Sequence, residues 1–180
     1  MPRKQSPPSF EYVLLGLLKQ KPMHGYELCR AAGQIEGVSL VWRINQSALY
    51  ALLERMEEMD WIAGRVVPGE SRPARKEYAL TDSGCRQFLD WVQQPVEHGR
   101  DIRQVFVAKL YFAEREGWPV AQRLVEAQRL RCQAWLEAFR TQVAQATPEQ
   151  GFDALVLDYR VQQMEGILSW LDRCRQRLAG

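Results

Sequence analysis

The sequence of 180 residues is poor in the side chains that most metal and catalytic sites require. Its only histidines and cysteines are His24, His98, Cys29, Cys85, Cys132 and Cys174. No C-x-x-C pair occurs among them, so neither a zinc site nor a disulfide framework is indicated. P-loop, G-x-S-x-G, H-E-x-x-H and Gly-rich dinucleotide motifs are also missing. We therefore expect no catalytic residues, no bound metal, no cofactor and no enzyme activity.

Long apolar runs and a strong excess of one charge are absent as well. The YVLLGLL run at residues 12–18 is far shorter than the roughly 20 residues that cross a bilayer, and the first residues lack the apolar centre of a signal peptide. We expect a cytoplasmic protein without a membrane partner. The 24 basic and 22 acidic side chains give a net charge of +2, which does not by itself indicate nucleic acid. An argument for DNA binding must therefore be local.

The first half of the chain predicts helices, a hairpin and a further helix. Spacing of apolar residues, turn-forming residues and a Thr-Asp cap set their limits. The expected elements are helices at about 10–18, 26–33 and 46–59, strands at 61–67 and 76–80, and a helix from about 82 to 95. Three helices followed by a hairpin is the order of a winged helix-turn-helix, in which the third helix enters the DNA major groove.

The second half predicts helices alone, at about 102–114, 120–146 and from 147 onwards, where Thr147, Pro148 and Gln150 form a capping pattern. The fold class is thus mainly α with a small β-hairpin. We expect a winged helix-turn-helix domain at residues 1–97 and an all-helical antiparallel arm at 98–180. Apolar residues of the last helix alternate four and three apart, as in a dimerisation seam: Leu157, Val161, Met164, Leu168 and Leu171. Their partner surface is either the preceding helix or a second chain.

Acidic residues are distributed unevenly along the third expected helix. Its core side is marked by Leu49, Leu52, Leu53, Met56 and Met59. No Asp or Glu occurs between Leu40 and Leu53, whereas four follow from Glu54 to Asp60. The outer face of the first half carries Gln46, Ser47 and Tyr50, whose groups can bond base edges and phosphates that carboxylates would repel. This half is therefore predicted to enter the groove.

The loop between the two expected strands is basic. Arg65, Arg72, Arg75 and Lys76 lie around residues 68–73, and Glu70 is the only acid between Arg65 and Lys76. Four cations on a protruding hairpin suit contacts with DNA phosphates. A charged turn is more often plain solvated surface, so this feature acquires weight only from its place after three helices.

Four blocks of sequence resemble the PadR-like transcriptional regulators, a family named for repressors that respond to phenolic acids. The blocks are residues 12–18 (YVLLGLL), 23–28 (MHGYEL), 47–57 (SALYALLERME) and 75–81 (RKEYALT), followed by Gly84. The family usually has Gly where Ala48 stands and an aromatic residue where Glu77 stands, and neither difference removes a DNA-contacting type. By matching position, the resemblance implies that Tyr26, Ser47 and Tyr50 touch DNA, with Lys76 near the wing.

The resemblance implies a homodimeric repressor that binds double-stranded DNA at a (pseudo)palindromic operator and responds to a small-molecule effector of unknown identity. The helical arm resembles the larger subfamily, whose C-terminal helices make the dimer, by architecture and not by motif. Two other classes remain open. One is a winged-helix adaptor that binds a protein partner and not DNA, and the other is a protein that sequesters a small molecule.

Overall fold

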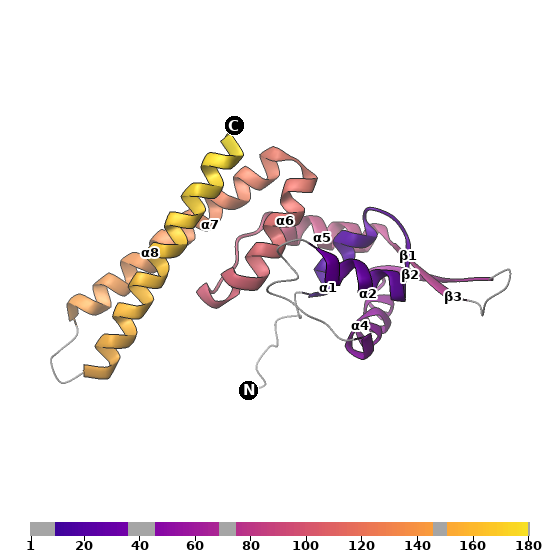
Figure 1. Ribbon diagram of the computed structural model, residues 1–180, viewed down its shortest axis with the longest axis horizontal. Coiled ribbons are helices and arrows are strands. Elements are labelled where there is room, and N and C mark those ends of the chain that lie inside the picture. Colours follow the sequence, from indigo (N-terminus) through magenta and orange to yellow (C-terminus); the bar gives the residue numbers. More distant parts are fainter. Residues whose placement is uncertain (1–9, 36–45, 69–74, 146–150, 180) are drawn as a thin grey trace. The chain divides into compact units, whose positions relative to one another are not determined.

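The computed structural model describes residues 10–35, 46–68, 75–145 and 151–179. It divides into two compact units, which Figure 1 shows with their element labels. Unit 1 comprises Met1–Val92 and Arg103–Phe112, and unit 2 comprises Gln93–Ile102 and Ala113–Gly180. Because the chain passes between the units more than once, the single boundary expected after residue 97 remains a proposal. Within the described residues, no helix combines the length and the apolar character needed to span a bilayer.

Unit 1 has the predicted order of elements and one strand that the sequence did not reveal. Its elements are α1 (Phe10–Leu18), β1 (Met23–His24), α2 (Gly25–Gln34), α4 (Gln46–Glu58), β2 (Ile62–Val67), β3 (Arg75–Leu80), α5 (Asp82–Gln93) and the first part of α6 (Val107–Glu116). The strands form an antiparallel sheet in the order β1-β3-β2. β1 escaped prediction because two residues cannot display a periodicity. The fold class expected from the sequence is confirmed.

The core of unit 1 forms around α1, which is apolar on nearly all sides and is therefore buried. Helix α4 packs its Leu49, Leu53 and Met56 inward, each with 0% exposure. The prediction for Met59 was wrong, because this residue is 37% exposed. The helix ends at Glu58, and the positive φ of Asp60 turns the chain away before another helical turn can bring Met59 to the core.

Gly84 marks a close approach between α5 and the chain leading into β2. A Cβ at this position would overlap the backbone carbonyl oxygen of Trp61, which cannot rotate away. We expect Gly84→Ala to lower the free energy of unfolding of unit 1 by about 2–3 kcal/mol through overpacking. Chemical denaturation followed by circular dichroism measures this loss.

Gly33→Ala is the matched control, since a Cβ at Gly33, also in a helix of unit 1, meets nothing within 4 Å. Alanine there should be neutral or slightly stabilising, because glycine is a poor helix former. Equal effects of the two substitutions would contradict the steric argument.

The second half of the chain has the predicted helices, which begin a little earlier or later than expected. The segment expected as one helix from 102 to 114 consists of a π-helical turn, Ile102–Phe106, followed by α6 to Glu116. Gly117, with φ +120°, makes the predicted break, and α7 (Trp118–Gln145) starts at once because Pro119 is well suited to a first helical turn. The expected caps at 147–150 lie outside the described residues, and α8 is described over Gly151–Ala179.

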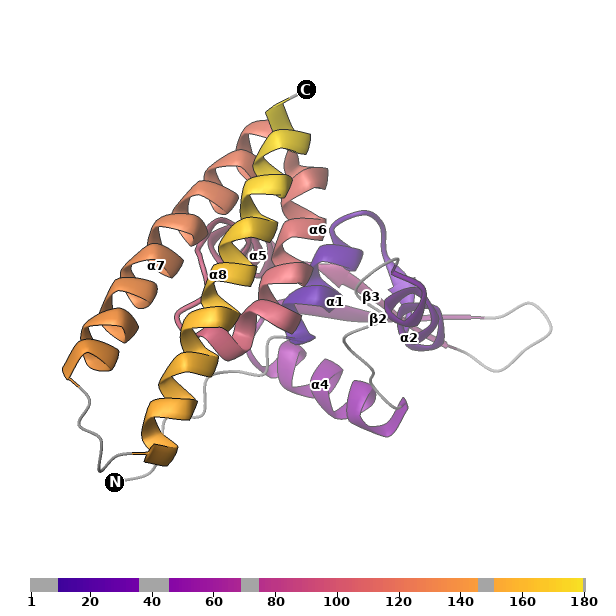
Figure 2. The ribbon, with the colours of Figure 1, turned by 60° about the vertical axis from the view of Figure 1, so that its left-hand side comes forward.

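The predicted seam of α8 packs against α7 inside the chain (Figures 1 and 2). Met164 and Leu171 are 2% and 0% exposed, which leaves these two side chains no surface to offer a second chain, contrary to the dimerisation role expected of them. Leu157, Val161 and Leu168 are half-buried. The intramolecular alternative therefore describes Met164 and Leu171, because two long antiparallel helices bury their shared apolar stripe first. A dimerisation role for the three half-buried residues stays a prediction.

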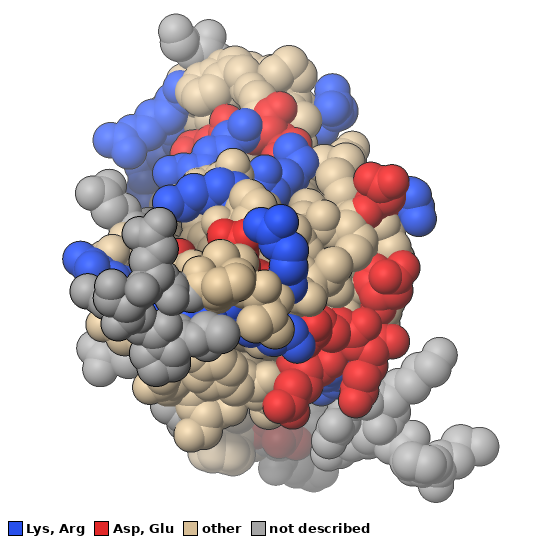
Figure 3. All heavy atoms as spheres, turned by 90° about the vertical axis from the view of Figure 1, so that its right-hand side faces the viewer, with Lys and Arg blue, Asp and Glu red and all other residues tan. Residues whose placement is uncertain are grey.

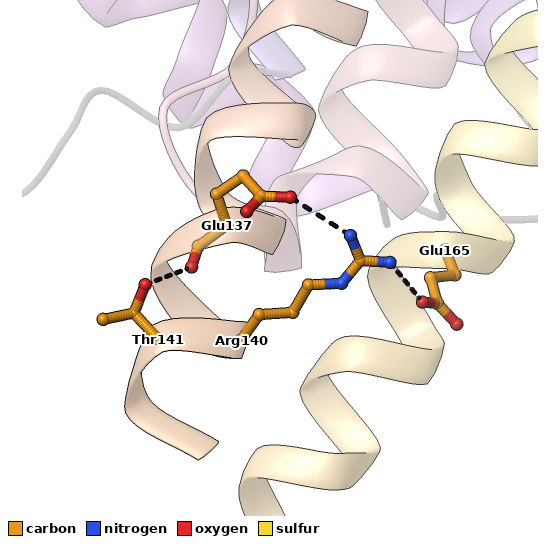
Figure 4. A network of polar contacts seen from close by, with 4 residues as sticks. All are labelled: Glu137, Arg140, Thr141 and Glu165. Atoms are coloured by element: carbon orange, nitrogen blue, oxygen red, sulfur yellow. Dashed lines mark hydrogen bonds and ion pairs between the residues drawn. The ribbon is translucent and has the colours of Figure 1, made fainter. Parts of the chain in front are cut away.

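Polar side chains join the same two helices at their surface, as Figure 4 shows. Arg140 of α7 donates to the carboxylate of Glu137 over 3.1 Å and to that of Glu165 of α8 over 2.9 Å. The hydroxyl of Thr141 donates to the backbone carbonyl of Glu137 over 2.9 Å. Only the contact between Arg140 and Glu165 joins the two helices, and as an exposed ion pair it contributes little to stability.

Candidate nucleic-acid interface

The first half of α4 presents the side chains that were predicted to read DNA. Gln46 and Ser47 are exposed, and Tyr50 is 38% exposed on the same side of the helix. Since Leu49 and Leu53 hold the opposite side in the core, the outer face cannot turn inward without unpacking unit 1. The first carboxylate on this face is that of Glu54, more than one turn further along.

Residues from four elements, β1, α2, α4 and β3, meet around one hollow of about 560 Å³ in unit 1. Its lining includes four of the predicted DNA-contacting residues, Tyr26, Tyr50, Arg75 and Lys76. They come from α2, α4 and β3, so the sequence brings them together only through folding. The hollow combines aromatic faces with cations, a combination that suits sugar and phosphate groups.

Gly25 allows the ring of Tyr50 to lie close against α2. A Cβ at Gly25 would lie 2.7 Å from Cε1 of Tyr50 and 3.1 Å from its hydroxyl oxygen, closer than side chains pack. The glycine therefore sets the position of the Tyr50 ring. Tyr26, the next residue, remains 65% exposed at the mouth of the hollow.

His24 connects α2 to the sheet and has no catalytic arrangement around it. It is the N-cap residue of α2, and its backbone N–H donates to the carboxylate of Glu27 over 3.1 Å. Its Nδ1 lies 3.3 Å from the carbonyl oxygen of Lys76, so a hydrogen bond there requires the tautomer with Nδ1 protonated. These contacts hold the start of α2 against β3.

Two of the predicted phosphate-binding cations are paired with carboxylates. Lys76 Nζ lies 2.6 Å from Glu57 Oε2, and this hydrogen bond raises the pKa of Lys76. Arg65 Nη2 lies 3.3 Å from Glu77 Oε2. Arg72 lies outside the described residues. Within the described part of the wing, which is the hairpin of β2 and β3, Arg75 has no carboxylate partner.

Glu57 is a residue of the site that sequence reasoning missed. Besides holding Lys76, it accepts a hydrogen bond from the backbone N–H of Gly64 over 3.1 Å, so one carboxylate ties α4 to both strands of the wing. Gly64 permits this, because a Cβ there would lie 2.5 Å from Glu57 Oε1. In the structure Glu57 is half-buried, whereas Glu54 and Glu58 are exposed. The helical wheel alone does not distinguish Glu57 from these acidic neighbours.

Tyr78 forms the inner wall of the hollow. It is 5% exposed, and burial raises the pKa of its hydroxyl. The Lys76 ammonium lies 5.4 Å from the centre of its ring, in cation–π geometry. Tyr78 therefore stays a neutral packing residue at physiological pH while its ring orients Lys76.

Figure 3 views the molecule from the end at which the wing projects. Lys and Arg side chains and Asp and Glu side chains both appear on this face, with the acids gathered towards one side of it. Charges of both signs are therefore present on this face. Binding of a polyanion must therefore depend on the positions of individual Lys and Arg side chains.

Unit 2 has a hollow of its own, of about 470 Å³. Trp135 and Phe139 of α7 and Arg160 of α8 line it, together with His98. Arg160 lies over the Phe139 ring at 5.1 Å from its centre. Among the described residues, no group of three or more His, Cys, Asp or Glu side chains is placed to hold a metal ion.

Comparison with known proteins gives a separate family match for each half of the chain. Residues 14–90 match the transcriptional regulator PadR-like family, and residues 102–179 match the family described as virulence activator alpha C-term. The negative transcriptional regulator PadR of Bacillus subtilis is 26% identical over 174 residues, which cover 90% of this chain and 93% of that protein.

A second relative matches about half of the chain, and a solved structure matches most of it at low identity. A probable transcriptional regulator of Mycobacterium tuberculosis is 28% identical over 92 residues, covering 51% of this chain and 48% of that protein. The crystal structure of B. subtilis PadR in complex with operator DNA has 23% identity and a TM-score of 0.48, and the match covers 95% of this chain and 99% of that chain. On this sequence match, residues 14–90 of the chain belong to the PadR-like family of transcriptional regulators.

Proposed function

We propose that this chain binds double-stranded DNA sequence-specifically as a homodimer and represses transcription at a (pseudo)palindromic operator, in response to a small-molecule effector. It acts in the cytoplasm, where the DNA lies, and it is not an enzyme. The observation that carries the proposal is the exposed, acid-free first half of α4, which stands beside Tyr26, Arg75 and Lys76 around one hollow.

In this proposal α4 reads the major groove and the wing holds the backbone. Gln46 can bond a base edge with its amide, and the Ser47 hydroxyl can bond either a base or a phosphate. Tyr26 and Tyr50 contribute hydroxyls at the backbone, while Arg65, Arg72, Arg75 and Lys76 contact phosphates. Leu49 and Leu53 keep α4 rigid, so the reading side chains start from fixed positions.

The repressor role rests on the B. subtilis relative, which is named a negative transcriptional regulator. The effector role is supported by the hollow of unit 2, where the aromatic rings of Trp135 and Phe139 lie beside the guanidinium of Arg160. Aromatic side chains beside a small number of polar groups are common in small-molecule sites. The identity of the effector is left open.

The homodimer is supported by an apolar strip of α8 that the helix pair leaves uncovered. Phe152, Leu155 and Tyr159 are 78%, 67% and 62% exposed, and Val156, which lies beside them, is 40% exposed. Residues three and four apart share one side of a helix, so these four form one strip. We propose that this strip meets the same helix of a second chain. Leu157, Val161 and Leu168 of the predicted seam lie on nearly the opposite side of α8, where they are half-buried in the single chain.

Fluorescence anisotropy with DNA from around the chain's own gene tests the proposal. We expect one segment to bind about a thousandfold or more tightly than random DNA at physiological salt, with affinity that falls steeply as salt rises. Equal affinity for all DNA segments, or none, would reject specific DNA binding. A partner captured at high salt and unaffected by polyanions would favour the protein-binding adaptor instead.

A further inference from the structure

The outer face of the wing carries a cation and a carboxylate side by side. Arg65 of β2 and Glu77 of β3 are directly opposite in the antiparallel register. The Arg65 side chain is 79% exposed and reaches the Glu77 carboxylate, which is 28% exposed, over 3.3 Å. Side chains at directly opposed positions of an antiparallel pair are adjacent, so the register of the strands places Arg65 and Glu77 next to each other.

We propose that Glu77 limits the affinity of this protein for DNA, by occupying the Arg65 guanidinium at the place where a DNA phosphate would bind. The inference rests on the proposed DNA-binding function. A carboxylate and a phosphate oxygen bind a guanidinium through the same hydrogen-bonding geometry, so the two compete for one donor group. When the wing docks, the Arg65 guanidinium must leave the Glu77 carboxylate and bind a DNA phosphate. The released carboxylate of Glu77 then remains close to the DNA backbone.

The other paired cation shows why Glu77 is the residue to test. Glu57 holds Lys76 over 2.6 Å but also accepts the Gly64 backbone N–H, so its removal would disturb the attachment of the wing to α4. For Glu77, the described side chain contact is the one with Arg65. A change at Glu77 therefore alters the charge pairing without removing a second contact of that kind.

Glu77→Gln keeps the shape of the side chain and removes its charge. We expect it to raise affinity for operator and random DNA alike by about threefold to fivefold near 0.1 M salt, the range given by the modest worth of an exposed ion pair. The slope of log affinity against log salt should steepen by about 0.9, as for one additional phosphate contact. Anisotropy titrations at several salt concentrations supply both numbers.

Two controls separate release of Arg65 from the mere loss of a negative charge. Glu58→Gln removes the same charge from an exposed position of α4 that forms no ion pair with the described part of the wing, and it should leave the salt slope unchanged. In the second control, Glu77→Gln is made in an Arg65→Gln background, where the change in slope should disappear. This double-mutant cycle isolates the coupling between the two side chains.

Each outcome decides the proposal. A gain and a steeper slope that both require Arg65 support it. An equal gain with Arg65 absent would show a general charge effect and overturn it, and so would unchanged or weaker binding of Glu77→Gln. If the unaltered protein binds no DNA, the proposed function fails; if it binds and Glu77→Gln does not differ from it, only this inference fails.

Discussion

Ser47→Glu should abolish operator binding while leaving unit 1 folded. The side chain at position 47 is exposed on the first turn of α4, within the stretch that has no carboxylate. In the groove, a glutamate would face the negative potential of the backbone in a partly desolvated contact, where like charges repel far more than in water. We expect a loss of at least about a hundredfold in operator affinity, measured by gel shift and anisotropy.

Two variants control for this substitution. Ser169→Glu adds the same charge at an exposed position of α8, and it should bind DNA almost as the unaltered protein does. Ser47→Ala removes the hydroxyl alone and should cost about tenfold or less, because a single hydrogen bond is worth little net energy. Circular dichroism and a thermal melt verify the fold. If Ser47→Glu bound the operator normally, α4 could not be the reading helix.

Leu155→Glu combined with Tyr159→Glu should split the dimer and, with it, operator binding. Both side chains are more than half exposed in the single chain, so the substitutions leave the α7–α8 core intact. Four buried carboxylates per dimer would face one another across the two-fold axis without partners. One winged helix supplies too small an interface for tight specific binding, so we expect the monomer to bind a two-half-site operator at least about a hundredfold more weakly.

Analytical ultracentrifugation at micromolar concentration measures the first effect and anisotropy the second. Leu130→Glu provides the control, because Leu130 is 56% exposed on α7 and lies outside the strip. Met164→Ala should behave differently again, lowering stability by about 2–5 kcal/mol because the side chain is buried within the chain. An unaltered protein that sediments as a monomer, or a folded double variant that remains dimeric, would reject the arrangement.

The order of the elements could be predicted from the sequence because each long element has its own pattern. α1 is apolar all round, α4 places Leu49, Leu53 and Met56 at helical spacing, and the turn-forming residues separate β2 from β3. Element type follows from such patterns, whereas the last residue of an element depends on local backbone conformation. Met59 illustrates this, since its exposure follows from the turn at Asp60 and not from spacing.

The candidate site could be predicted only in part, because pairings between distant residues are invisible in a pattern. The exposure of Gln46, Ser47 and Tyr50 follows from the wheel of α4. The convergence of Tyr50 with Tyr26 and Lys76 around one hollow depends on the tertiary fold, including strand β1, and the carboxylate partners of the wing cations depend on tertiary contacts and strand register. Glu77 was noted only as a departure from the related family, yet its opposed position makes it a counter-ion of Arg65.

The contact between Gly25 and Tyr50 bears on how this protein could acquire a new target sequence. The Tyr50 ring is wedged against the backbone of α2, so exchanging it would disturb the junction of two helices. Gln46 and Ser47 lie exposed on the same helix and can vary at little cost to folding. A library that seeks altered operator preference should therefore randomise positions 46 and 47 and retain Tyr50. Natural divergence of operator preference among such regulators is expected at the same two positions.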